Sequence, residues 1–236
     1  MKPNGSRARA ALLLIWIVFG LEVLSLISAW MQYNLLQDIV AGKYVSENDI
    51  AWNELREQLV GFIYGVALLI SAITFIRWFR RAYGNLGHAG YHLTYREGWA
   101  AGAWFVPFLN WLRPYQIMRE LYEGSRIAIP QMEAKQALTK GRRNLPFWWL
   151  FWLANNILGQ VIFNMSRRTQ TLDTLQFITG LSIISNVVGL FLCMLTVLVI
   201  REYARVEDLL VAKADPYTDT YLPAEEEPGE LLKEVY

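Results

Sequence analysis

The first candidate for chemistry in this chain of 236 residues is a glutamate inside an apolar run. Glu22 lies near the middle of residues 10–31, where an ionised carboxylate costs about 3 kcal/mol unless it is paired or hydrated. In another apolar run Asn156, Gln160 and Asn164 recur every four residues and form an amide stripe, with Asn155 beside it. We favour a protonated Glu22 that binds this stripe and holds helices together. A proton- or ion-conducting path is the alternative.

The two histidines offer a second candidate site. His88 and His92 are four residues apart, which on a helix would place two metal ligands on one face, with Glu97 as a third. The residues between them do not form the HExxH pattern, and nearby glycines disfavour a regular helix. We therefore interpret both as solvated loop histidines and predict no metal site.

Motifs typical of enzymes are absent from the sequence. It contains no phosphate-binding loop, nucleophile elbow, zinc pattern or dinucleotide fingerprint. Its single cysteine, Cys193, excludes an intrachain disulfide, and a net charge of +1 does not favour nucleic-acid binding. We predict a protein that is not an enzyme, without catalytic residues or cofactors.

Basic residues flank two of the apolar runs. Such clusters contact anionic lipid headgroups, at about 1 kcal/mol per basic residue. They also fix the topology of a membrane protein without any specific ligand, and both interpretations stay open. The residues concerned are Arg77, Arg80, Arg81, Lys140, Arg142 and Arg143.

Four apolar runs must position these side chains. Hydrophobic residues make up 54% of the chain, and each run approaches the roughly 20 residues that span a bilayer as a helix. We predict an all-α integral membrane bundle with transmembrane helices at 10–31, 59–79, 146–165 and 177–200. The first run is too long for the apolar part of a cleaved signal peptide, so we expect it to be retained.

The distribution of charge predicts the orientation. Eighteen of the 22 lysines and arginines lie in the N-terminus, in the segment 77–143 or in the tail. The positive-inside rule therefore places both termini and the middle segment in the cytoplasm, as expected for a multi-pass protein of a bacterial inner membrane. Residues 1–9 are then a cytoplasmic N-terminus, 10–200 the transmembrane domain, and 201–236 a helix extension followed by an acidic tail. Tryptophans at the ends of the runs, including Trp78, Trp148 and Trp149, are expected in headgroup belts.

Between the second and third runs lies a shorter apolar segment. Residues 98–111 are too few for a comfortable crossing and are interrupted by Pro107 and Asn110. We expect a re-entrant or interfacial element, shielded by the other helices; a fifth crossing is the less favoured alternative. The following residues, from Pro114 to Gly124, predict an amphipathic helix, which lies on the cytoplasmic leaflet or, alternatively, packs against the protein. The two elements together span 98–125.

This middle part of the chain resembles the bacterial membrane family known as domain of unknown function 4328, over about residues 60–200. The residues that carry the resemblance are Trp78, Arg81, Asn85, Gly98, Trp99, Gly102, Trp104, Pro107, Asn110, Pro114, Met118 and Glu120. The resemblance implies a multi-pass protein with a cytoplasmic or interfacial central motif, and it implies no activity.

Together these observations predict a non-catalytic accessory, assembly or scaffold subunit. Its partners would be the bilayer, including anionic lipids, and a membrane-protein partner or further copies of the chain, but no nucleic acid. The alternative is a small oligomeric channel or transporter whose path includes Glu22 and the amide stripe.

Overall fold

The computed structural model describes residues 3–167 and 171–213, which form helices and no strand. The helices are α1 (Gly5–Val40), α2 (Glu47–His88), α3 (Trp99–Gly102), the 3-10 helix η1 (Leu109–Trp111), α4 (Arg113–Ala128), α5 (Met132–Ser166) and α6 (Leu172–Lys213). The predicted acidic tail lies outside the described residues. The all-α prediction is confirmed for the part of the chain that the structure describes.

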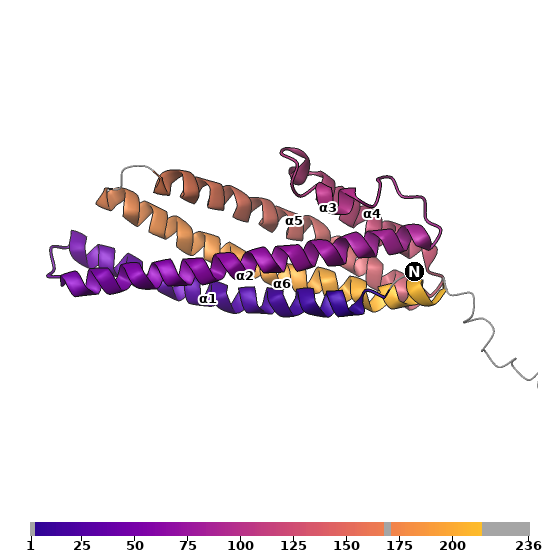
Figure 1. Ribbon diagram of the computed structural model, residues 1–236, viewed down its shortest axis with the longest axis horizontal. Coiled ribbons are helices and arrows are strands. Elements are labelled where there is room, and N and C mark those ends of the chain that lie inside the picture. Colours follow the sequence, from indigo (N-terminus) through magenta and orange to yellow (C-terminus); the bar gives the residue numbers. More distant parts are fainter. Residues whose placement is uncertain (1–2, 168–170, 214–236) are drawn as a thin grey trace, which may run out of the picture.

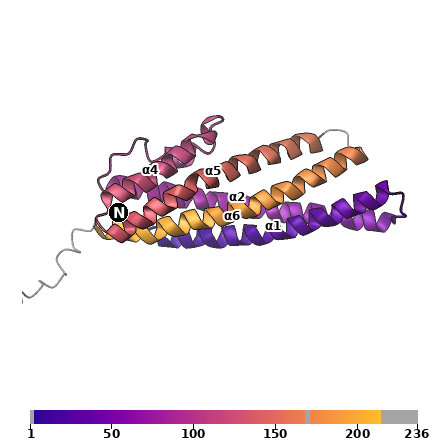
Figure 2. The ribbon, with the colours of Figure 1, turned by 180° about the vertical axis from the view of Figure 1, so that it is seen from behind.

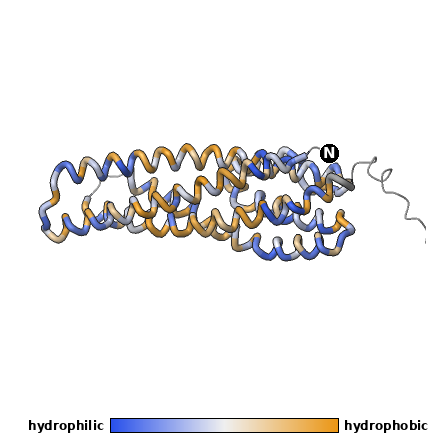
Figure 3. The backbone as a smooth tube through the Cα atoms, turned by 90° about the horizontal axis from the view of Figure 1, so that it is seen from below, coloured by the Kyte–Doolittle hydropathy of each residue, from blue (hydrophilic) through white to orange (hydrophobic). Residues whose placement is uncertain are grey.

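Three of these helices, α1, α2 and α6, are long and apolar enough to cross a membrane. Their large apolar side chains face outward: Leu13 and Leu69 are each 63% exposed and Phe191 is 56% exposed. A water-soluble protein rarely exposes so continuous an apolar surface. Figure 3 shows that apolar residues occupy the middle of the bundle and hydrophilic residues its two ends. The chain is therefore compatible with a membrane protein, as the apolar runs predict.

Local sequence determines where several helices begin and end. The Ser46 hydroxyl accepts a hydrogen bond from the backbone N–H of Asp49 (3.1 Å) and so caps α2, as its sequence predicts. Pro114 lies in the first turn of α4, where its missing N–H costs nothing. Beyond the end of α2, Gly90 has a φ of 87°, which other residues rarely adopt. These local features fix the helix ends before any packing is considered.

The long helices lie side by side in the order α2, α1, α6, α5 (Figures 1 and 2). Helix α1 packs on both α2 and α6, while α5 packs on α6 and, nearer its start, on α4. One end of the bundle holds the start of α1, the end of α2, all of α4 and the start of α5; we call it the basic end. The opposite end holds the α1–α2 turn and the end of α5.

The main core lies at the basic end and is aromatic. Trp78, Phe79 and Tyr83 of α2 are completely buried there, and the Tyr122 hydroxyl donates to the carbonyl of Val199 (2.7 Å). Trp148 is only 2% exposed and donates to Thr196 of α6. The prediction that Trp78, Trp148 and Trp149 belong to headgroup belts is therefore wrong, because their rings join the helices.

Helix α4 is amphipathic as predicted, but it extends to Ala128 instead of ending near Gly124. Its apolar side chains, including Ile117, Met118 and Leu121, are fully buried against protein. The expectation that this helix lies on the lipid surface is therefore corrected. Packing against α5 and α2 buries its apolar face more completely than a lipid surface would.

The apolar segment 98–112 contains only the short helices α3 and η1. The Trp104 ring contacts the rings of Phe75 and Trp152, each with centroids 5.6 Å apart. Its neighbours Phe105 and Phe108 are 74% and 84% exposed. One part of the segment is thus fixed in the bundle, while its apolar tip projects away from the protein.

Candidate functional site

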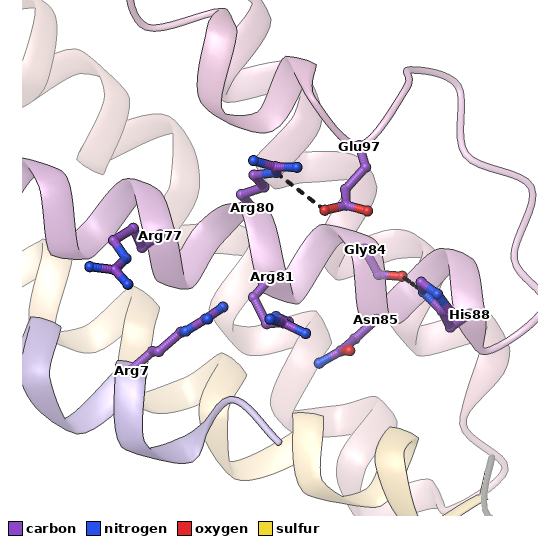
Figure 4. A pocket seen from close by; sticks show the side chains of 8 residues that line it. All are labelled: Arg7, Arg77, Arg80, Arg81, Gly84, Asn85, His88 and Glu97. Carbon is purple, nitrogen blue, oxygen red and sulfur yellow. Dashed lines mark hydrogen bonds and ion pairs between the residues drawn. The ribbon is translucent and has the colours of Figure 1, made fainter. Parts of the chain in front are cut away.

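Four arginines surround a cavity of about 600 Å³ at the basic end, a size typical of small-ligand sites. Arg7 comes from the first turns of α1, and Arg77, Arg80 and Arg81 come from the last turns of α2. Figure 4 shows the guanidinium groups of Arg7, Arg77 and Arg81 near the space between the two helices, whereas Arg80 points toward Glu97 on the other side of α2. We call this the arginine pocket; its other lining residues are Gly84, Asn85, His88 and Glu97.

The pocket has an excess of positive charge. Among the described residues, Arg80 is its only arginine in an ion pair, with Glu97 at 3.2 Å. The pKa of Arg7 is lowered, first by partial desolvation and then by the charges of Arg81 and Arg77. The N-terminus of α1, with no acidic residue in its first turn, adds the positive end of a helix dipole. An anion would relieve this repulsion.

A buried carboxylate anchors the start of α1, the helix that carries Arg7. The Asn4 amide donates to both oxygens of Glu207 (3.0 Å each), and the Asn85 amide donates to the same carboxylate (2.8 Å). Asn4 also donates to the carbonyl of Trp78 (3.2 Å). Burial raises the pKa of Glu207, and these hydrogen bonds oppose the rise. This Glu207 latch joins the beginning of α1 and the end of α6 to the pocket wall.

The six basic residues that flank the apolar runs do not form one site. Arg77, Arg80 and Arg81 line the arginine pocket, whereas the basic residues of α5 line other cavities. Arg142 is paired with Glu123 of α4 at 2.8 Å. The six residues that share a positive charge and a position beside an apolar run thus lie on two separate surfaces.

Glu22 is 2% exposed and lies between three helices. It accepts a hydrogen bond from the Tyr64 hydroxyl of α2 (2.7 Å). Gly189 of α6 lies so close that any β-carbon there would overlap the Glu22 carboxylate. Glu22 therefore joins α1 to α2 and lies against α6, which agrees with the structural interpretation of this residue.

The amide stripe does not meet Glu22, and the predicted hydrogen bond between them is wrong. Asn156, Gln160 and Asn164 are exposed on α5, and Asn156 donates to the carbonyl of Trp152 in its own helix (2.8 Å). Asn155, next to the stripe, accepts a hydrogen bond from Ser185 of α6 (3.2 Å). The rotation of α5 about its axis turns the stripe away from α1.

The histidines do not share a helical face. His88 is the last residue of α2 and its Nδ1 lies 2.6 Å from the carbonyl oxygen of Gly84, while His92 lies beyond the helix. Within residues 3–167 and 171–210, no group of three or more metal-ligating side chains occurs.

Most of the residues that carry the family resemblance build the basic end. Glu120 is the clearest example, because it accepts hydrogen bonds from the Tyr83 hydroxyl (2.7 Å) and the backbone N–H of Thr94 (2.6 Å). It thereby ties α4 to α2 and to the loop after α2. Burial, and next the hydrogen bond to Glu120, raise the pKa of Tyr83, so its hydroxyl keeps the proton that it donates.

The rest of this motif surrounds the segment 98–112. The Arg113 guanidinium lies over the Trp99 ring (4.7 Å) and the Tyr95 ring (4.9 Å), which fixes the two ends of the segment together. Gly98 precedes α3 and Gly102 is its last residue. Pro107 lies at the tip, Asn110 lies in η1, and Met118 is buried in the core. Arg81 and Asn85 are the two motif residues that line the arginine pocket.

Sequence reasoning missed Arg7, Asn4, Glu207 and Tyr64. Asn4 and Glu207 are 203 residues apart, so no spacing pattern relates them. In the sequence, Arg7 contributes only to the charge count that predicts the orientation. It precedes the first apolar run, which puts it at a similar depth to Arg77 and Arg81 at the end of the second run. That relation could have indicated a shared site.

Comparison with known proteins identifies the family of this chain. No curated protein and no solved structure matches the chain. The model of the domain of unknown function DUF4328 matches residues 41–205, which include three arginines of the pocket and every motif residue named above. The chain therefore belongs to the DUF4328 family.

Proposed function

We propose that this protein is a non-catalytic, four-crossing protein of a bacterial inner membrane whose arginine pocket binds the phosphate of anionic lipids at the cytoplasmic surface. In this role it serves as an accessory or scaffold subunit for a membrane partner. The observation that carries the proposal is the cavity bounded by four arginines, of which only Arg80 forms an ion pair with another of the described residues. Charge-assisted hydrogen bonds from guanidinium groups are the usual means of binding phosphate.

Helix α5 is proposed as the fourth crossing. It has 35 residues, enough to exceed a hydrocarbon core of about 30 Å, and it packs along α6. In the first part of the predicted crossing its outward side chains are apolar: Phe147 and Leu150 are 58% and 61% exposed. Trp148 and Trp149 are buried, but Asn156, Gln160 and Asn164 are exposed, so within residues 146–165 the surface left for lipid is apolar except for this amide stripe.

The segment 98–112 is proposed to re-enter the cytoplasmic leaflet. Trp104 contacts Phe75, which lies one turn inside the end of the predicted second crossing. The exposed apolar tip, from Phe105 to Phe108, would then lie in hydrocarbon, while the backbone of α3 is covered by the bundle. Figure 1 shows the segment turned back toward the middle of the long helices.

A phospholipid fits the surroundings of the arginine pocket. Arg77 is followed, along the same face of α2 and toward the middle of the bundle, by the exposed side chains of Ile73, Ile70 and Val66. This apolar strip can cover acyl chains while the headgroup phosphate contacts the guanidinium groups. A soluble phosphate compound has no acyl chain to contact this apolar strip.

The lipid proposal predicts selective stabilisation. In neutral detergent, phosphatidylglycerol should raise the thermal unfolding temperature by on the order of 5 °C, because a ligand that binds only the folded state stabilises it. Phosphatidylcholine should have little effect, because its choline cation would face the arginines. Glycerol phosphate and inorganic phosphate provide the control for a soluble anion; stabilisation by them to the same extent would contradict lipid binding.

The topology predicts the accessibility of three positions in a Cys193→Ser background. Tyr44→Cys and Leu172→Cys should react with a membrane-impermeant maleimide added to the periplasmic side, and Ile127→Cys should react only after permeabilisation. All three side chains are exposed, so burial does not limit their reaction. Protection of Leu172→Cys alongside labelling of Tyr44→Cys would show that α5 does not cross.

A further inference from the structure

We propose that the outer half of α5 is the surface through which two copies of this chain associate, with the amide stripe at the centre of the contact. The inference goes beyond lipid binding, and it rests on the proposal that α5 crosses the membrane. The observation behind it is the position of the amide stripe: the three amides lie on a face of α5 that the other helices of the chain do not cover.

The neighbours of α5 change along its length. Near the basic end its inner face is covered: Leu145 is fully buried, and Trp149 donates to the carbonyl of Trp111 (3.0 Å) in the segment 98–112. Toward the other end the same side of the helix is open, and Asn156, Gln160 and Phe163 are exposed. The segment 98–112 thus covers the first part of this face and leaves the rest free.

The exposed amides have hydrogen-bonding groups that lipid cannot satisfy. Asn156 uses one N–H on its own helix, and its side-chain oxygen accepts no hydrogen bond from the part of the chain that the structure describes. Gln160 and Asn164 make no hydrogen bond with that part of the chain either. Hydrocarbon offers neither donors nor acceptors, so these groups gain free energy from any polar helix that covers them.

A second copy is the occupant that the chemistry favours. In a dimer with its two-fold axis along the membrane normal, a residue at the axis faces its own counterpart. A carboxamide both donates and accepts, so Asn156 can pair with Asn156 and Gln160 with Gln160. Arginines or carboxylates at these positions would repel their counterparts instead.

The spacing of the residues on this face is also typical of a packed pair of helices. Leu153, Asn156, Gln160 and Phe163 are separated by three, four and three residues, the alternation that brings one side of a helix repeatedly against a partner. A polar residue within such a contact fixes its register.

Cross-linking in native membranes tests the proposal. In the Cys193→Ser background, Gln160→Cys should form a disulfide-linked dimer when copper phenanthroline is added as oxidant. Val161→Cys, at the same depth but about 100° around the helix, should not. Equal cross-linking at both positions, or none at position 160, would overturn the proposal.

The strength of association provides a second, independent measurement. The double variant Asn156→Leu and Gln160→Leu should weaken dimerisation in lipid bilayers by about tenfold, measured by energy transfer between labelled chains. Ile157→Ala with Val161→Ala, on the neighbouring face, is the matched control. Unchanged dimerisation in the leucine variant overturns the proposal, and it does so separately from the topology if Leu172→Cys still reacts from the periplasmic side.

Discussion

Replacing Arg77 and Arg81 with glutamine is expected to weaken the binding of phosphatidylglycerol about 30-fold. Each basic residue near an anionic headgroup contributes about 1 kcal/mol, and two of them amount to roughly 30-fold in the dissociation constant. The apparent constant can be measured from the lipid dependence of thermal unfolding in neutral detergent. Glutamine keeps most of the side-chain length, so the change tests charge more than packing.

The matched control removes the same charge from another surface. Lys140→Gln with Arg143→Gln eliminates two positive charges on α5, where both side chains are exposed and line cavities other than the arginine pocket. This variant should bind phosphatidylglycerol nearly as the wild type does. An equal loss in the two double variants would mean that the protein attracts anionic lipid through its general charge.

The Glu207 latch offers a test of the same site without a change in charge. Asn4→Ala removes the amide that joins the start of α1 to Glu207 and to the carbonyl of Trp78. Arg7 would then lose its fixed position, and lipid binding should weaken although all four arginines remain. Full binding by this variant would show that Arg7 contributes little to the pocket.

The Gly189→Ala substitution is expected to lower the free energy of unfolding by about 1–3 kcal/mol, the usual cost of overpacking a tight contact. The added β-carbon would overlap the Glu22 carboxylate and force α6 away from α1. Reversible unfolding in mixed detergent measures the effect. Gly180→Ala in the same helix is the control, because nothing lies within 4 Å of a β-carbon at that position.

A double-mutant cycle with Glu22 tests the cause of the destabilisation expected for Gly189→Ala. Adding Glu22→Ala to Gly189→Ala removes the carboxylate that the new methyl group meets. The effects of the two substitutions on the free energy of unfolding should therefore be non-additive, and Glu22→Ala should restore part of the stability lost in Gly189→Ala. Additive effects would mean that the methyl at position 189 clashes with something other than Glu22. Glu22→Gln should preserve the hydrogen bond from Tyr64 and leave the fold intact.

Local features of the sequence predicted much of the helical structure. The apolar runs identified all four long helices, and Pro114 marked the beginning of α4. These predictions succeed because helix formation and capping depend on residues within a few positions of each other. The family motif was also recognisable from sequence, although its residues turn out to be mostly packing residues of the basic end.

The candidate sites were predicted less well, and for a different reason. Spacing correctly placed Asn156, Gln160 and Asn164 on one face of a helix, but it could not tell which neighbour that face would meet. The expected partner, Glu22, binds Tyr64 instead. In the same way, the arginines of α2 were noticed, but Arg7 was not assigned to their site.

The sequence by itself determined that the chain is helical, which segments are apolar enough for a membrane, and at which end the positive charge gathers. These properties are sums over neighbouring residues, so they can be read without knowing the fold. The tertiary structure alone decided that Arg7 meets Arg81, that Asn4 meets Glu207, and that the amide stripe faces away from the bundle. Each of these depends on the rotation of one long helix about its axis relative to another, and contacts between distant parts of the chain set that rotation.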